Sequence, residues 1–65
     1  MKSKSFLDIG CAEGTLLKIV ESKYNSITTS GIEPSIEFGN YANQNVKGDV
    51  FCGTYQEYLA KNSNS

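Results

Sequence analysis

The chain has 65 residues, with six basic and seven acidic side chains and a net charge of −1 at pH 7. Lysines this scattered argue against nucleic-acid binding by a basic surface. No apolar run approaches the roughly 18 residues of a membrane span, and Phe6 to Ile9 is too short for a signal-peptide core. We therefore expect a cytoplasmic protein with no membrane partner. A chain of this size buries only about 60% of its unfolded surface, so its core should be marginal.

The first predicted elements are a strand and a helix joined by a short loop. Phe6 to Ile9 is apolar and β-prone, which is typical of a buried strand. A helix is expected from Thr15 to Tyr24, where apolar side chains recur at helical spacing. The loop between them contains Gly10 and Gly14, which suit a sharp turn and let a ligand approach bare backbone. This unit is typical of a site for a nucleotide-like ligand.

The remaining chain continues the alternation of strands and helices. We expect a strand from about Ile27 to Glu33, a helix from about Ser35 to Asn43, a strand from Asp49 to Gly53 and a short helix from Gln56 to Ala60. This pattern predicts right-handed crossovers and a parallel sheet. No linker or repeat divides residues 1–65, which we interpret as one unit. Four aromatic residues are expected to be structural core residues: Tyr24, Phe38, Tyr41 and Phe51.

The spacing of the small residues in the loop separates two kinds of nucleotide-like ligand. A dinucleotide fingerprint places its third glycine five residues after the first, where this chain has Thr15. Small residues fall instead at Gly10, Ala12 and Gly14. Asp8, at the end of the strand, would repel a pyrophosphate and attract a ligand that carries an ammonium and a sulfonium. These residues favour S-adenosylmethionine over NAD.

At this loop, Asp-Ile-Gly-Cys-Ala-Glu-Gly, the chain resembles the class I S-adenosylmethionine-dependent methyltransferases. Their first motif ends a strand with an acidic residue and continues with G-x-G-x-G, so Asp8, Gly10 and Gly14 match it and Ala12 departs from it. A second match is Gly-Ile-Glu-Pro-Ser, because the family has an acidic residue at the position of Glu33 that accepts hydrogen bonds from both ribose hydroxyls. The resemblance implies an α/β, Rossmann-like three-layer α/β/α fold. Only its first half would be present, with parallel strands 1–3 in the order 3-2-1.

A third, partial match follows the third strand, where the family often places Gly-Asp and the aspartate binds the adenine amino group. This chain has Thr54 instead, so adenine would be bound by the Thr54 hydroxyl, by the backbone amide of Tyr55 and by Gln56. The resemblance thus implies one set of cofactor-binding residues: Asp8, Gly10, Cys11, Ala12, Gly14, Glu33, Pro34, Thr54 and Tyr55.

The two cysteines, Cys11 and Cys52, lack the spacing of metal ligands, and the chain has no histidine. We therefore expect no metal site. Without a histidine to activate it, Cys11 is expected to fill space rather than act as a nucleophile. A disulfide is not expected either. Strands 1 and 3 would flank strand 2 and lie about 9.6 Å apart, beyond the roughly 7 Å that a disulfide spans.

The leading hypothesis is methyl transfer from S-adenosylmethionine to a small-molecule acceptor. The site residues would position the donor, since the rate of such a displacement comes mainly from proximity and orientation. Any general base and the acceptor pocket would lie in sequence outside this chain. Two alternatives remain open, namely a Rossmann oxidoreductase fragment that binds NAD or FAD, and a non-catalytic remnant or binding module. The residues do not specify the acceptor, nor whether oxygen, nitrogen or carbon is methylated.

The length of the chain indicates a fragment. The family's fold needs about seven strands, and the sequence pattern predicts three. In the family, strand 1 lies in the middle of the sheet and pairs with strand 4 on its far side, so Phe6 to Ile9 would here form an apolar, unpaired edge. We expect the isolated chain to show no methyl transfer and, if it folds, to self-associate through strand 1.

Overall fold

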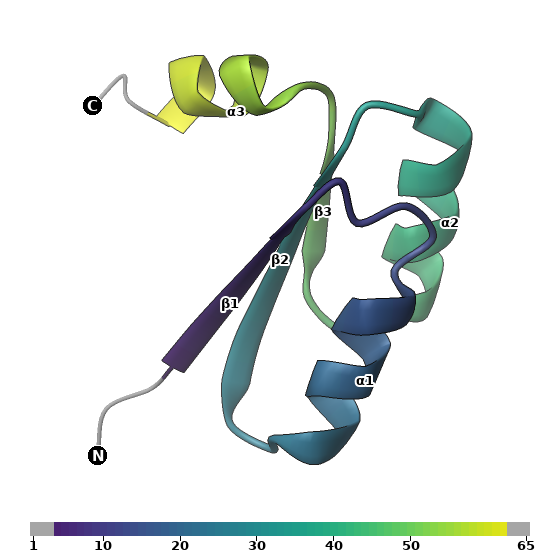
Figure 1. Cartoon of the computed structure of the whole chain (residues 1–65), viewed down its shortest axis with the longest axis vertical. Helices are drawn as coiled ribbons and strands as arrows, with labels where there is room; N and C mark the ends of the chain where they lie inside the picture. The colour runs from purple at the N-terminus through teal and green to yellow at the C-terminus, as the bar shows by residue number, and fades with distance from the viewer. Residues whose placement is uncertain (1–3, 63–65) are drawn as a thin grey trace.

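The computed structural model describes residues 4–62, so both ends of the expected 1–65 unit lie outside the described part (Figure 1). Strands and helices alternate as predicted, and each begins and ends within two residues of the expected position. In chain order they are β1 (Lys4–Ile9), α1 (Thr15–Lys23), β2 (Ile27–Glu33), α2 (Ile36–Asn45), β3 (Asp49–Cys52) and α3 (Tyr55–Asn62).

The strands of residues 4–62 form one parallel sheet in the order β1-β2-β3, which confirms the predicted order. Lys4 pairs with Ile27 at the start of β1, and Ser30 pairs with Asp49 at the start of β3. The helices α1 and α2 lie on one side of the sheet, as crossovers of the same hand require. The helix α3 lies on the other side, near the carboxyl ends of the strands (Figure 1).

The core lies between the sheet and the helices α1 and α2. Its centre is Leu17, which is fully buried, and Phe6 of β1 packs against its edge. Gly31 of β2 permits this close packing, because a Cβ there would lie 2.7 Å from the Cys11 Sγ atom and 2.9 Å from the Leu17 Cδ1 atom. The other buried members are Cys11, Ala42, Val46 and Val50.

The expectation that Tyr24, Phe38 and Tyr41 lie in the core is wrong. These side chains are 59%, 51% and 55% exposed. Tyr24 lies just beyond α1, as its C-cap in an extended conformation. The helix α2 packs through its small buried residues, Gly39 and Ala42, which turns its aromatic side chains towards solvent.

Phe51 is partly buried, on the face of the sheet that α3 covers. Its ring meets that of Tyr58 edge to face, with 5.7 Å between the ring centroids. The Lys61 ammonium lies 5.5 Å from the Phe51 ring centroid. Phe51 therefore anchors α3 rather than contributing to the main core.

Candidate functional site

Backbone hydrogen bonds link the carboxyl ends of the three described strands at one edge of the sheet. The loop after β1 bends over β2, and the amides of Gly10 and Cys11 donate to the Ile32 carbonyl at 2.7 and 3.2 Å. On the other side of β2, the Gly53 amide donates to the Glu33 carbonyl at 2.9 Å. The structure thus brings the first two predicted motifs into direct contact.

The three small residues of the loop have left-handed backbone conformations in the described structure, with φ of 78° at Gly10, 52° at Ala12 and 90° at Gly14. A Cβ built on Gly10 meets no described atom within 4 Å, so the space above this residue is open to a ligand. A Cβ on Gly14 would come within 3.0 Å of a Val46 side-chain carbon. Gly10 therefore leaves room for a ligand, whereas Gly14 allows α2 to pack.

We expect Ala12→Gly to stabilise the chain by about 0.5–1 kcal/mol. A left-handed conformation costs an L-residue roughly 1–2 kcal/mol, and the greater freedom of glycine in the unfolded chain offsets roughly 0.4–1 kcal/mol of the gain. Urea titration followed by circular dichroism measures the difference. The matched control is Ala42→Gly in the buried face of α2, which should destabilise. A less stable Ala12→Gly variant would show that the loop is not strained at this residue.

Glu33 is 8% exposed and ends β2 at the centre of this edge. Its Oε1 atom accepts a hydrogen bond from the Ala12 amide at 2.7 Å, and its Oε2 atom accepts one from the Ser35 amide at 2.9 Å. The carboxylate is therefore held in one orientation between the loops that follow β1 and β2. Each carboxylate oxygen has a second lone pair, so both can still accept a hydrogen bond from the hydroxyl of a ligand.

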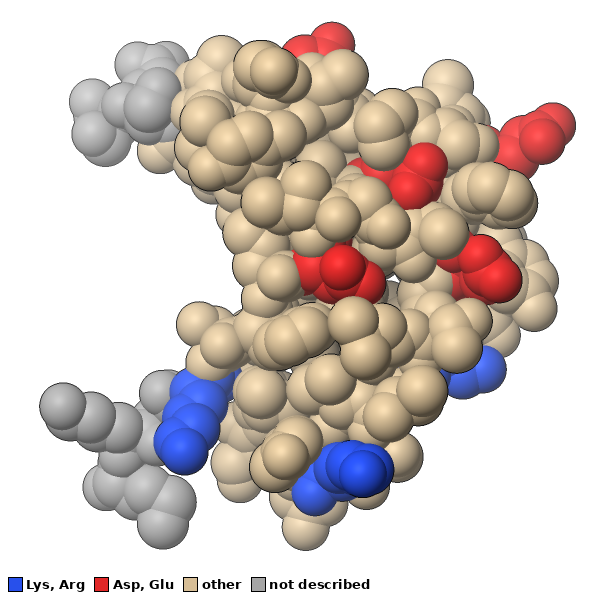
Figure 2. All heavy atoms as spheres, viewed as in Figure 1, with Lys and Arg blue, Asp and Glu red and all other residues tan. Residues whose placement is uncertain are grey.

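Negative charge gathers at the same edge. Asp8 is half-buried, and Cys11 is buried beside it. Burial raises the pKa of the Cys11 thiol above its ordinary value, and the charges of Asp8 and Glu33 raise it further. Cys11 is thus a neutral thiol at pH 7, which agrees with its predicted role as filler. On the face seen in Figure 2, the visible acidic side chains lie over the half of the molecule that holds the strand ends, and the visible lysines lie over the other half.

Thr54 is a helix cap in this structure. Its amide donates to the Glu57 Oε1 atom at 2.7 Å, and the Glu57 amide donates to the Thr54 Oγ1 atom at 3.1 Å. This reciprocal pair is a capping box at the start of α3. The Thr-x-x-Glu pattern of residues 54–57 is the local sequence signal for this cap. Of the other predicted residues, Pro34 is exposed in the loop after β2, and Tyr55 is exposed at the start of α3.

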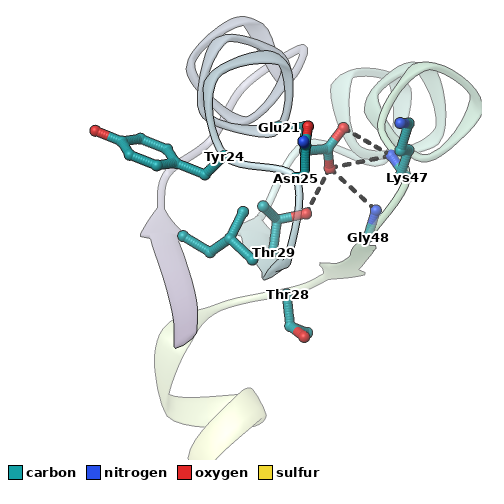
Figure 3. A pocket seen from close by; sticks show the side chains of 8 residues that line it. Glu21, Tyr24, Asn25, Thr28, Thr29, Lys47 and Gly48 are labelled. Atoms are coloured by element: carbon teal, nitrogen blue, oxygen red, sulfur yellow. Dashed lines mark hydrogen bonds between the residues drawn. The ribbon is translucent and has the colours of Figure 1, made fainter. Parts of the chain in front are cut away.

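A second polar cluster, which the sequence did not predict, lies at the opposite edge of the sheet (Figure 3). The Glu21 carboxylate of α1 accepts hydrogen bonds from the Thr29 hydroxyl, from the Lys47 amide at 2.9 and 3.0 Å, and from the Gly48 amide at 3.1 Å. These residues border an open cavity of about 240 Å³. Every bond of this carboxylate joins parts of the chain to one another, so Glu21 has a structural role.

Residues 4–62 hold neither a metal site nor a disulfide. No group of three or more His, Cys, Asp or Glu side chains in this range could hold a metal ion. Cys11 and Cys52, both within the described part, are free thiols. The helices described here are all too short or too polar to cross a membrane.

Comparison with solved structures shows that the fold matches the first half of a Rossmann-like methyltransferase fold. The chain is similar to the plantazolicin methyltransferase BpumL in complex with SAH (S-adenosylhomocysteine), with a TM-score of 0.77 and 31% identity over 82% of this chain. The complex of BpumL with a monoazolic desmethylPZN analog and SAH gives 0.75 and 32% over 95% of this chain. The chain spans only 21% to 23% of the length of BpumL. No family model and no curated protein matched the sequence.

Proposed function

We propose that this chain binds S-adenosylmethionine and its product S-adenosylhomocysteine, as the donor-binding part of a methyltransferase. The observation that carries the proposal is the fixed Glu33 carboxylate, hydrogen-bonded to the Ala12 and Ser35 amides beside the open space above Gly10. The similarity to BpumL, whose structures contain SAH, supports it over the same part of the chain.

Each group at this edge has a defined task in the proposal. Glu33 accepts hydrogen bonds from the two ribose hydroxyls, using the lone pairs that the backbone amides leave free. The bare backbone at Gly10 lets the ligand approach closely. Asp8 attracts the ammonium and sulfonium groups of the donor. Together they orient the methyl group for an in-line displacement, in which orientation supplies most of the rate.

The acceptor in this proposal is a small organic molecule bound by residues beyond this chain. BpumL was solved with desmethylPZN analogs as well as SAH. In the described part of this chain, the loops around Glu33 consist of residues that we assign to the donor. The acceptor would therefore be bound by other segments.

We expect S-adenosylmethionine and S-adenosylhomocysteine to bind the chain and NAD not to bind. Two-dimensional NMR of the ¹⁵N-labelled chain would locate the ligand, and the amide signals of Gly10, Cys11 and Ala12 should shift most. Asp8→Asn should weaken binding of the sulfonium form at least as much as that of the neutral thioether, because only the former adds a positive charge near the carboxylate. Equal affinity for NAD, or shifts confined to the Glu21 end of the sheet, would contradict the proposal.

A further inference from the structure

The strand β3 has an outer side that no strand of residues 4–62 pairs with, because β3 stands last in the order β1-β2-β3. On its inner side, the Gly53 amide donates to the Glu33 carbonyl of β2. Because alternate residues of a strand face the same neighbour, Val50 and Cys52 direct their N–H and C=O groups to the outer side. Backbone groups in this position are a template to which another strand can add.

The backbone of Val50 is already paired on the outer side. The Asn43 Nδ2 atom of α2 donates to the Val50 carbonyl at 2.8 Å, and the Val50 amide donates to the Asn43 Oδ1 atom at 2.8 Å. A side-chain amide carries an N–H donor and a C=O acceptor, as a peptide group does. The Asn43 side chain therefore takes the place that the backbone of a neighbouring strand would take beside Val50.

We propose that Asn43 closes the outer edge of β3 against the addition of a further strand, from a second copy of this chain or from another protein. A strand that adds at this edge must displace both bonds of Asn43. Two neutral hydrogen bonds of this kind oppose its addition by about 5- to 150-fold. The four residues of β3 include Val50 and Phe51, which favour strands, so an open edge here would be prone to association.

The position of Asn43 suits this role. Asn43 is exposed in the last turn of α2, whereas Val50 is buried, so the side-chain amide lies between the edge of the sheet and solvent. Figure 1 shows α2 beside β3. The closing bonds lie within residues 43–50. The inference therefore depends neither on where the chain begins or ends nor on donor binding.

Amide hydrogen exchange of the full chain, followed by NMR, tests the bonds themselves. In wild type, the Val50 amide should exchange at least tenfold more slowly than the Cys52 amide, although both face the outer side of β3. In Asn43→Ala, the Val50 amide should lose this protection. Asn45→Ala is the matched control, because the Asn45 side chain bonds to the Tyr41 carbonyl of its own helix. Both substitutions place a better helix former in α2, and only the first should expose Val50.

The dependence of the NMR spectrum on concentration tests the edge. In Asn43→Ala, the amide signals of Val50 and Cys52 should shift or broaden at concentrations at least tenfold below those that affect them in wild type. These signals report on β3, so association through another part of the chain does not enter the result. Val46→Ala removes buried contacts at the end of α2 and lowers stability, but it leaves the Asn43 bonds in place and should not cause these changes.

Circular dichroism shows whether each variant is folded. If Asn43→Ala is unfolded, Asn43→Ser replaces it, since the shorter serine side chain cannot make both bonds. Three results would each overturn the proposal. They are a Val50 amide that exchanges as fast as that of Cys52 in wild type, a folded Asn43 variant whose β3 signals stay as independent of concentration as those of wild type, and equal changes in Val46→Ala.

Discussion

Replacing Glu33 by alanine should weaken binding of S-adenosylhomocysteine by about 10- to 100-fold. Loss of a charged acceptor from a largely buried contact costs roughly 1.5–3 kcal/mol, which corresponds to that change in affinity. The variant also releases the Ala12 and Ser35 amides that now bond to the carboxylate. Isothermal titration calorimetry measures the affinity. Glu37→Ala, an exposed acidic residue in the first turn of α2, is the matched control and should bind normally.

Glu33→Gln separates the shape of this side chain from its charge. Both carboxylate oxygens accept from backbone N–H groups, so the amide nitrogen of glutamine would face a donor at one of the two positions. We expect this variant to lose affinity as well as stability. A folded Glu33→Ala variant with unchanged affinity would remove Glu33 from the ligand site, whatever its role in the fold.

The second large effect is expected at Glu21, at the opposite edge of the sheet from Glu33. Glu21→Ala should destabilise the chain by about 2–3 kcal/mol, because the Thr29 hydroxyl and the Lys47 and Gly48 amides lose a charged acceptor. For a chain whose total stability is small, this loss is severe. Urea titration at pH 7 measures it. Glu37→Ala again serves as the control, since the exposed Glu37 lies on the outside of α2.

The same carboxylate gives the chain a dependence on acid. Burial tends to raise the pKa of Glu21, but the hydrogen bonds from Thr29, Lys47 and Gly48, together with the Lys47 charge, outweigh burial and hold the pKa below its ordinary value of 4.5. A carboxyl group whose pKa is lower in the folded chain adds stability above the unfolded pKa and loses it as the pH falls through the folded pKa. Below pH 4.5, wild type should lose stability more steeply than Glu21→Gln. Identical pH profiles would show that Glu21 does not cause the loss.

The alternation of strands and helices could be read from the sequence because it depends on local patterns. Apolar runs, helical spacing and the glycines of the first loop each act within a few residues. Glu33 was indicated by the resemblance to the methyltransferase motifs, and the carboxyl ends of neighbouring parallel strands do lie at one edge of the sheet. Local patterns do not show which distant group each polar side chain will bond to. The hydrogen bond from the Ala12 amide to Glu33 is therefore seen only in the structure.

The errors have the same physical origin. Phe38 and Tyr41 fit a helical stripe, but which stripe of α2 meets the sheet depends on where small residues allow close approach. Tyr24 was expected in a helix that ends one residue before it. Glu21 is one acidic residue on a helix, and its role depends on a loop that lies 26 residues later in the chain. The cap at Thr54 was different, because its signal was local and could have been found.

The position of Glu33 has a consequence for how this chain folds. Its carboxylate joins Ala12, 21 residues earlier, to Ser35, so the site does not exist until β1 and β2 are paired and α1 is in place. A ligand that binds only the assembled site stabilises the whole unit by mass action, by about 2.7 kcal/mol at a concentration of 100 times its Kd. In so small a chain that contribution rivals the burial of a large core side chain. The bound ligand would then contribute to the stability of the folded chain, and saturation with ligand would raise the Tm.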